Sequence, residues 1–159
     1  DIENAKMINL IAKKLQKKIA VVVSDYKLAV VAKRFIAQFN ENAKHFVSFF
    51  EIPEGGHNFI VGLRGIRKRC FAIILRRTSE DSTLKKYMDS VEKLISDIES
   101  IRYVVDDKVF CWKTLLEPTY LADVLSVFLA DVKGENSFDI EEITMLKKMI
   151  LRGGSWCMH

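Results

Sequence analysis

Two side chains able to transfer protons, Glu41 and His57, lie sixteen residues apart in the stretch FNENAKHFVSFFEIPEGGHNFIVG, residues 39–62. Carboxylates and imidazoles are the usual general bases and acids of enzymes, and imidazole exchanges its proton near neutral pH. Each residue also has a purely structural interpretation. A glutamate at the end of a helix is commonly a solvated surface group, and a histidine behind a Gly-Gly turn commonly serves only the local fold. The pattern by itself therefore suggests a proton-transfer site and leaves these alternatives open.

Strand and helix patterns alternate around these two residues. The run KIAVVVS predicts a strand over 18–24 that is covered on both faces, because it is continuously apolar and β-branched. Pro53 and the Gly55-Gly56 turn end a second strand over 46–52. Further strands are expected at 69–76 and 101–106, and helices at 3–17, at 27–43, from Ser82 as N-cap, at 119–132, and from an Asp139–Glu142 capping box to Gly153-Gly154.

This alternation predicts one α/β domain, a three-layer sandwich with a mainly parallel sheet flanked by helices. Within it, residues 1–17 form a leading helix, 18–152 the α/β core and 153–159 a tail. Ligands of such sheets gather at the carboxyl ends of the strands. The polar residues expected near that edge are Asp25, Glu51, His57 and Thr78.

Composition excludes several classes of function. The net charge of +4 permits an anionic ligand, but it is too small to indicate a nucleic-acid-binding protein. No apolar run is long enough to cross a membrane, and no His/Cys spacing predicts a metal site. The three unpaired cysteines are expected to be thiols in a reducing cytoplasm, with Cys70 and Cys111 buried. His45 is expected at the surface beside Lys44.

Two segments resemble a known family. RFIAQFNENAKHFVSFFEIPEGGHNFIVG, residues 34–62, is similar to the segment R-W-x-x-Q-x-N-E-N-A-K…E-x-P…x-x-H-N-E of the bifunctional phosphoglucose/phosphomannose isomerases, members of the sugar isomerase (SIS) superfamily. The tail from Leu121 to Ile150 resembles the family's closing segment, G-D-x-x-S-x-Y-L-A…I-x-x-L-K-x-x-L. The matching residues there are Asp123, Ser126, Phe128, Leu129, Ala130, Ile143, Leu146 and Lys147.

The resemblance implies that the chain is the second of two tandem SIS domains in an aldose–ketose isomerase of glucose, mannose and fructose 6-phosphates. Glu41 would be the base that moves a proton between C2 and C1 through a cis-enediol. His57, reaching the site from the other subunit of a homodimer, would open the sugar ring, and Lys147 would stand near the substrate's oxygens. Removal of a proton beside a carbonyl suits a carboxylate with a raised pKa, and none of these steps needs a metal or organic cofactor.

The chain departs from the family pattern at several positions. SDYK, residues 24–27, replaces a glycine-containing turn, Ile36 stands where lysine is common, and Phe59 replaces an acidic residue. The Ser/Thr-rich loop that grips phosphate belongs to the family's first domain. The hydroxyl-bearing stretch RRTSEDST, residues 76–83, is interpreted here as a strand-to-helix connection, since two acids interrupt it.

Three classes of function therefore remain. The first is an isomerase half-site that needs a partner domain and a dimer, and it predicts weak or no turnover by these residues alone. The second is a non-catalytic SIS module that binds a phosphosugar or serves regulation. The third is an SIS domain kept for dimerisation. The basic cluster RGIRKRC, residues 64–70, is expected to be a solvated connection, because no aromatic residues interleave its charges.

Overall fold

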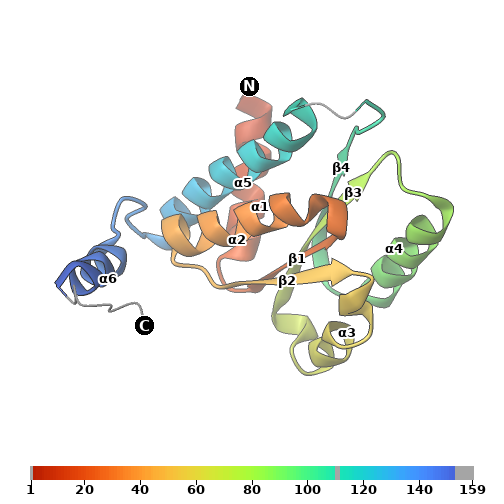
Figure 1. Ribbon diagram of the computed structural model, residues 1–159, viewed down its shortest axis with the longest axis horizontal. Helices are drawn as coiled ribbons and strands as arrows, with labels where there is room; N and C mark the ends of the chain where they lie inside the picture. Colours follow the sequence, from red (N-terminus) through yellow and green to blue (C-terminus); the bar gives the residue numbers. More distant parts are fainter. Residues whose placement is uncertain (1, 110–111, 153–159) are drawn as a thin grey trace, which may run out of the picture.

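The computed structural model describes residues 2–109 and 112–152, and its centre is a parallel sheet with the strand order β2-β1-β3-β4 (Figure 1). The strands are β1 (Ile19–Asp25), β2 (Val47–Ile52), β3 (Cys70–Arg77) and β4 (Glu99–Val105). The helices are α1 (Ile2–Leu15), α2 (Ala29–Ala43), α3 (Phe59–Gly62), α4 (Ser82–Leu94), α5 (Trp112–Lys133) and α6 (Glu141–Arg152). The predicted α/β class and parallel sheet are confirmed.

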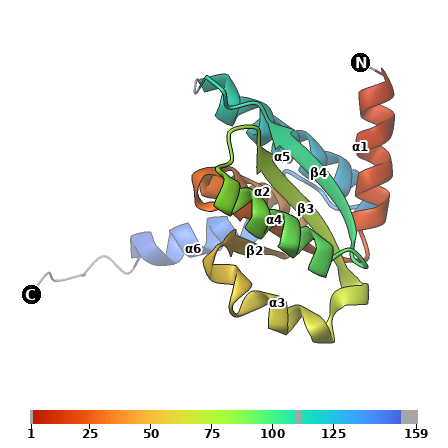
Figure 2. The same cartoon turned by 90° about the vertical axis from the view of Figure 1, so that its right-hand side faces the viewer.

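Each face of the sheet has its own apolar core. Alternate strand residues such as Val22 and Ile73 pack against α1, α2 and α5, while Val21 and Ile74 pack against α3 and α4. The central strands β1 and β3 are buried on both faces, as their uninterrupted apolar runs predict. Figure 2 shows the resulting three layers edge-on, and both views show α6 projecting away from them.

Most element boundaries differ from the prediction by one or two residues, and the starts of two helices are informative. Asp81, not Ser82, caps α4, because its carboxylate accepts from the backbone amides of Thr83 and Leu84 at 3.0 and 2.9 Å. α5 begins at Trp112 instead of residue 119, so that Pro118 lies inside the helix. Proline usually marks a helix boundary, but here its ring is buried in the core.

The last helix begins at Glu141, two residues after the expected cap. Asp139 still contributes to this start, since its Oδ1 accepts from the amide of Glu141 at 3.2 Å. Cys70 is a buried thiol, as predicted, whereas Cys111 and Cys157 lie outside the described residues. The predicted stop at Gly153-Gly154 and the tail over 153–159 lie outside them as well.

Candidate functional site

Glu41 lies in the last turn of α2 and its side chain is exposed. The helix ends two residues later, at Ala43, because Lys44 adopts the left-handed conformation with φ 46° and its amide donates to the carbonyl of Phe39. The N-E-N-A-K motif thus forms the carboxyl end of one helix. This end faces the amino-terminal edge of the sheet, since the chain passes directly from α2 into the start of β2.

Two side-chain pairs fix this end of α2 against α5. Arg34 donates from Nε and Nη2 to the two carboxylate oxygens of Asp123 at 2.8 and 3.1 Å. Two turns beyond, Asn42 Nδ2 donates to Ser126 Oγ at 2.8 Å. The hydrogen bond with Asp123 raises the pKa of Arg34, and the charge of Glu41 acts in the same direction. These four residues belong to the two segments of the family resemblance, and their contacts fix the helix that carries the exposed Glu41.

Two lysines neutralise the negative end of the α2 dipole. Lys44 Nζ donates to the carbonyl of Glu41 at 2.9 Å, and Lys133 Nζ donates to the carbonyl of Lys44 at 2.9 Å. Lys44 Nζ also donates to the carbonyls of Asn136 and Asp139 at 2.8 and 2.6 Å. Cations are favoured at the carboxyl end of a helix, where backbone carbonyls have no intrahelical partners. Lys44 therefore attaches the segment leading into α6 directly beside Glu41.

His45 is buried, with 7% of its surface exposed, which corrects the expected surface position. Its ring packs edge-on against Phe39, and its Nε2 meets no hydrogen-bond partner within the described part of the chain. Burial lowers the pKa of His45 to about 4, and the charge of Lys133 adds to this effect. The neutral ring is part of the packing beneath the end of α2. His45 was expected at the surface because it follows the charged Lys44. The left-handed conformation of Lys44 instead turns the chain so that the ring of His45 is buried.

His57 is exposed and follows the cis Ile52–Pro53 peptide bond and the Gly55-Gly56 turn at the end of β2. A Cβ atom on Gly55 would lie 2.1 Å from Cδ2 of Phe50, so only glycine fits against that buried ring. The turn is also held from α4, because the Tyr87 hydroxyl donates to the carbonyl of Pro53 at 3.1 Å. The sequence pattern placed His57 correctly beyond a strand end.

The topology separates the candidate residues. Glu41 precedes β2 and His57 follows it, and a six-residue strand is about 20 Å long. In Figure 1 the last turn of α2 lies beside the segment leading to α6, while the loop to α3 lies beyond the arrowhead of β2. Lys147 is exposed on α6, the helix whose leading segment Lys44 attaches beside Glu41. One copy of the chain therefore does not bring Glu41 and His57 together.

The carboxyl end of the sheet contains a closed ion-pair network. Arg77 Nε donates to Asp25 Oδ2, and Arg77 Nη1 donates to Asp107 Oδ2, both at 2.7 Å. The side chains of Arg77 and Asp25 are only 4% and 2% exposed. Burial by itself disfavours the charge of Arg77, but its bonds to Asp107 and Asp25 raise its pKa overall. Burial likewise opposes the charge of Asp107, yet hydrogen bonds from Ser79 and Arg77 hold its pKa below the ordinary value.

The hydroxyls of the predicted connection over 76–83 belong to the same network. Ser79 donates from its amide to Asp107 Oδ1 at 2.8 Å, and Thr78 Oγ1 donates to Asp106 at 3.0 Å. Arg76 turns to the other face and binds Glu80, Asp89 and Glu92, which secures α4. The stretch is therefore a strand-to-helix connection, as predicted. Sequence reasoning missed its role as the centre of an ion-pair network. Two pairs of charged residues, Arg76-Arg77 and Asp106-Asp107, each directly follow an apolar run and could have indicated this role.

Two further properties concern the described residues. Within 2–109 and 112–152, no cluster of three or more His, Cys, Asp and Glu side chains is arranged to hold a metal ion. In the same part of the chain, no helix has both the length and the apolar character needed to cross a membrane.

Solved structures share this arrangement of sheet and helices. A glucose-6-phosphate isomerase like protein from Thermus thermophilus matches 89% of this chain and 46% of its own, with a TM-score of 0.67 and 14% identity. The C-terminal domain of glucosamine-fructose-6-phosphate aminotransferase from Francisella tularensis matches 86% and 42%, with a TM-score of 0.63 and 13% identity. At such identities the likeness shows the fold alone, and the protein shares the α/β sandwich fold of these structures.

The family follows from the sequence match. Residues 4–150 match the family of the bacterial phospho-glucose isomerase C-terminal SIS domain, and the chain belongs to it. A bifunctional phosphoglucose/phosphomannose isomerase from Aquifex aeolicus (strain VF5) is 26% identical over 141 residues. That match covers 87% of this chain and 44% of the Aquifex protein, so this chain spans less than half the length of that relative.

Proposed function

We propose that this chain is the C-terminal half of an isomerase that interconverts glucose 6-phosphate or mannose 6-phosphate with fructose 6-phosphate. His57 transfers a proton to the ring oxygen as the ring opens. Glu41 removes the proton from C2 of the open aldose and returns it to C1, so that a cis-enediol forms between the two steps. Lys147 stabilises the negative charge that develops on the enediol oxygens.

The observation that supports this proposal most directly is the scaffold around Glu41. An exposed carboxylate at a helix carboxyl end is disfavoured by the helix dipole. Arg34–Asp123 and Asn42–Ser126 nevertheless hold the backbone around it firmly against α5. A fixed backbone beneath a free carboxylate is the arrangement a general base requires, because proton transfer from carbon depends on position.

The half-site needs two additions. A further SIS domain binds the phosphate, because Arg77 at the carboxyl end of this sheet is already paired with Asp25 and Asp107. His57 must come from a second copy, because it lies across the length of β2 from Glu41. We therefore propose a homodimeric, cytoplasmic two-domain enzyme that binds neither nucleic acid nor membrane.

The test uses the intact two-domain protein and the conversion of fructose 6-phosphate. We expect Glu41→Gln to lower kcat by about 10²–10⁴-fold while phosphosugar binding persists, because the amide keeps the shape and removes the base. His57→Ala should lower turnover of the ring-closed sugar as well. Glu117→Gln, an exposed glutamate on α5, is the matched control and should retain full activity. Unchanged turnover in Glu41→Gln would contradict the assignment, and robust turnover by residues 1–159 alone would contradict the half-site.

A second candidate is a non-catalytic SIS module that binds a phosphosugar or mediates dimerisation. The closed Arg77 ion-pair network at the carboxyl end of the sheet favours it, together with Ile36 and Phe59 at positions where the family commonly has charged residues. Titration calorimetry of fructose 6-phosphate into residues 1–159 distinguishes the two roles of such a module. Heat of binding without turnover in the intact protein supports a sensor, and no heat supports a dimerisation domain.

A further inference from the structure

Packing does not fix helix α6 against the sheet. Every side chain from Phe138 to Leu151 is exposed, including the apolar Ile143, Leu146 and Ile150, which share one face of the helix. Figures 1 and 2 show the helix projecting from the three layers. Lys147 lies in the middle of this helix. A side chain that acts on a substrate must be held in position, so the position of α6 has to come from its attachment to the domain.

The attachment is made by the ammonium of Lys44. Its Nζ donates to the carbonyls of Asn136 and Asp139 at 2.8 and 2.6 Å, and to the carbonyl of Glu41 at 2.9 Å. An ammonium has three hydrogens to donate, which matches these three carbonyls. Within the described part of the chain, the hydrogen bonds between residues 136–151 and the rest of the domain all come from this ammonium.

The backbone of Lys44 has a conformation that suits glycine better than lysine. Its φ of 46° and ψ of 44° lie in the left-handed region, at the carboxyl cap of α2. A Cβ atom is strained in that region, and glycine is the residue that most often ends a helix in this way. Glycine would therefore form the same turn with less strain, and the end of α2 does not by itself require the side chain of Lys44.

Lys133 fixes Lys44 from the side of α5. It is the last residue of that helix, and its Nζ donates to the carbonyls of Ala43 and Lys44 at 2.5 and 2.9 Å. The backbone of Lys44 is thus bound to the ends of both α2 and α5. Its ammonium starts from a fixed point when it binds the segment that leads into α6.

The geometry of α6 makes this attachment consequential for Lys147. Asp139 lies two residues before α6, and Lys147 lies six residues beyond the first residue of the helix, about 9 Å along its axis. A tilt of about 20° at the anchor moves a group about 9 Å away by about 3 Å, which is the length of a hydrogen bond. A cation that stabilises charge on substrate oxygens must lie within hydrogen-bonding distance of them.

We propose that Lys44 is a positioning residue whose ammonium sets the place of Lys147 relative to Glu41. This inference rests on the proposed function, which gives Glu41 the proton and Lys147 the enediol oxygens. Lys44 binds the backbone carbonyl of Glu41 and the two carbonyls that lead into α6, so the base and the cation keep a fixed separation. Loss of these bonds slows the proton transfer and leaves binding of the phosphate, which lies on the further domain, nearly unchanged.

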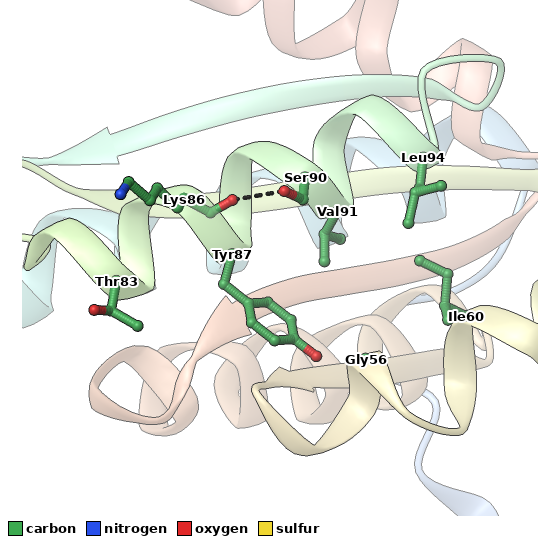
Figure 3. Close-up of a pocket in the computed structure, with 8 residues that line it drawn as sticks. All are labelled: Gly56, Ile60, Thr83, Lys86, Tyr87, Ser90, Val91 and Leu94. Atoms are coloured by element: carbon green, nitrogen blue, oxygen red, sulfur yellow. Dashed lines mark hydrogen bonds between the residues drawn. The ribbon is translucent and has the colours of Figure 1, made fainter.

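Lys86 provides a lysine without such bonds. It lies on α4 beside a hollow of about 590 Å³ that Gly56, Ile60 and Tyr87 also line (Figure 3). Figure 3 shows the carbonyl of Lys86 accepting from Ser90 Oγ, at 2.8 Å, whereas Lys86 Nζ forms no hydrogen bond with any described residue. This hollow borders the turn after β2, at the other end of that strand from α2. Replacement of Lys86 therefore removes the same charge and leaves the attachment of α6 intact.

Pulsed electron paramagnetic resonance tests whether Lys44 positions α6. The 159-residue chain carries serine in place of its two cysteines outside the described residues, with spin labels at Lys33→Cys on α2 and Lys148→Cys on α6, both exposed. We expect one narrow distance distribution, which Lys44→Gly broadens and Lys86→Ala leaves unchanged. A distribution that is already broad in the unmodified chain, or one that Lys44→Gly does not change, overturns the proposal.

Turnover by the intact two-domain protein tests whether this position serves the reaction. Lys44→Gly should lower kcat for fructose 6-phosphate about 10–100-fold and change KM by less than about threefold. Its midpoint of thermal unfolding should not fall, because glycine forms the left-handed turn without strain. Lys44→Arg keeps hydrogen-bond donors on a cation and should recover part of the lost kcat, and Lys86→Ala should retain full activity.

The outcomes separate this inference from the proposed function. If Lys44 serves only to end α2, Lys44→Gly keeps full activity, and that result overturns the positioning role. Loss of turnover in Glu41→Gln alongside it would leave the isomerase proposal standing. An unmodified intact protein that converts no phosphosugar overturns the isomerase proposal and the role of Lys44 together, even where the distance distributions behave as expected.

Discussion

At the carboxyl end of the sheet, Arg77 is enclosed between Asp25 and Asp107, whereas at the amino end Glu41 stands exposed on a helix held by Arg34–Asp123 and Asn42–Ser126. Both ends combine carboxylates with cations. At the first, each charge is satisfied inside the protein, and the network links β1, β3 and the loop after β4. At the second, the charges fix a backbone, and the Glu41 carboxylate forms no side-chain hydrogen bond or ion pair among the residues that the structure describes. The number of charged groups therefore does not locate a site, since a group acts on a ligand only where it is fixed in position and not already paired within the protein.

The largest expected effect comes from breaking the closed network. Arg77→Leu should lower the free energy of unfolding by about 3–5 kcal/mol, because it leaves two carboxylates buried without their cation. Arg34→Leu is the matched control at the other end. It removes a half-exposed pair and should cost about 0–1 kcal/mol. Urea denaturation of both variants measures the contrast, and equal losses would show that the two ends do not differ as described.

A smaller effect is expected from the turn that positions His57. Gly55→Ala should destabilise the chain by about 1–3 kcal/mol, because its Cβ would collide with the ring of Phe50, which is fully buried. Gly62→Ala is the control, since a Cβ there meets no atom within 4 Å among the described residues. It should stay within about 0.5 kcal/mol of the unmodified chain. Thermal and urea unfolding check both, and a harmless Gly55→Ala would mean that this turn is not fixed by packing.

The smallest effect concerns His45, which faces Phe39, Lys133 and the backbone of Lys18. Its pKa is about 4 in the folded chain and about 6.5 when unfolded, so the unfolded state takes up the proton first as the pH falls. Stability is therefore complete above pH 6.5 and declines toward pH 4. Between pH 7.5 and 5 the loss should be about 1 kcal/mol after allowance for solvent screening.

His45→Phe separates this contribution from other titrations. Phenylalanine keeps the edge-on contact with Phe39 and takes up no proton, so the variant should lose less stability over that interval. Urea unfolding at the two pH values measures the difference. Identical pH dependence in the variant and the unmodified chain would exclude His45 as the source.

Much of the fold followed from periodicity alone. The uninterrupted apolar runs of β1 and β3 identified the buried central strands, and the helical spacing of α2 identified the helix that ends with N-E-N-A-K. Local rules were less reliable at boundaries. The N-cap of α4 is Asp81, one residue before the predicted Ser82. α5 continues through Pro118, which is buried in the core. These outcomes depend on tertiary packing, which overrides the preference of a single residue.

The candidate residues were also visible in the sequence, but their arrangement was not. Glu41 and His57 were chosen from a motif and from position after a turn, and both are exposed in the folded chain. Their supporting contacts came from the structure, because Asp123 and Ser126 are more than eighty residues away from Arg34 and Asn42. No spacing rule along the chain connects α2 with α5.

The sequence by itself determined the class of fold, the family and the identity of the groups able to move protons, because each of these depends on residue type and short-range pattern. Only the tertiary structure decided that β2 separates Glu41 from His57 and that Arg77 closes the carboxyl end of the sheet. It alone revealed that α6 leaves its apolar face exposed. These are distances and contacts between segments far apart in the chain, which are fixed when the strands pair and the layers pack.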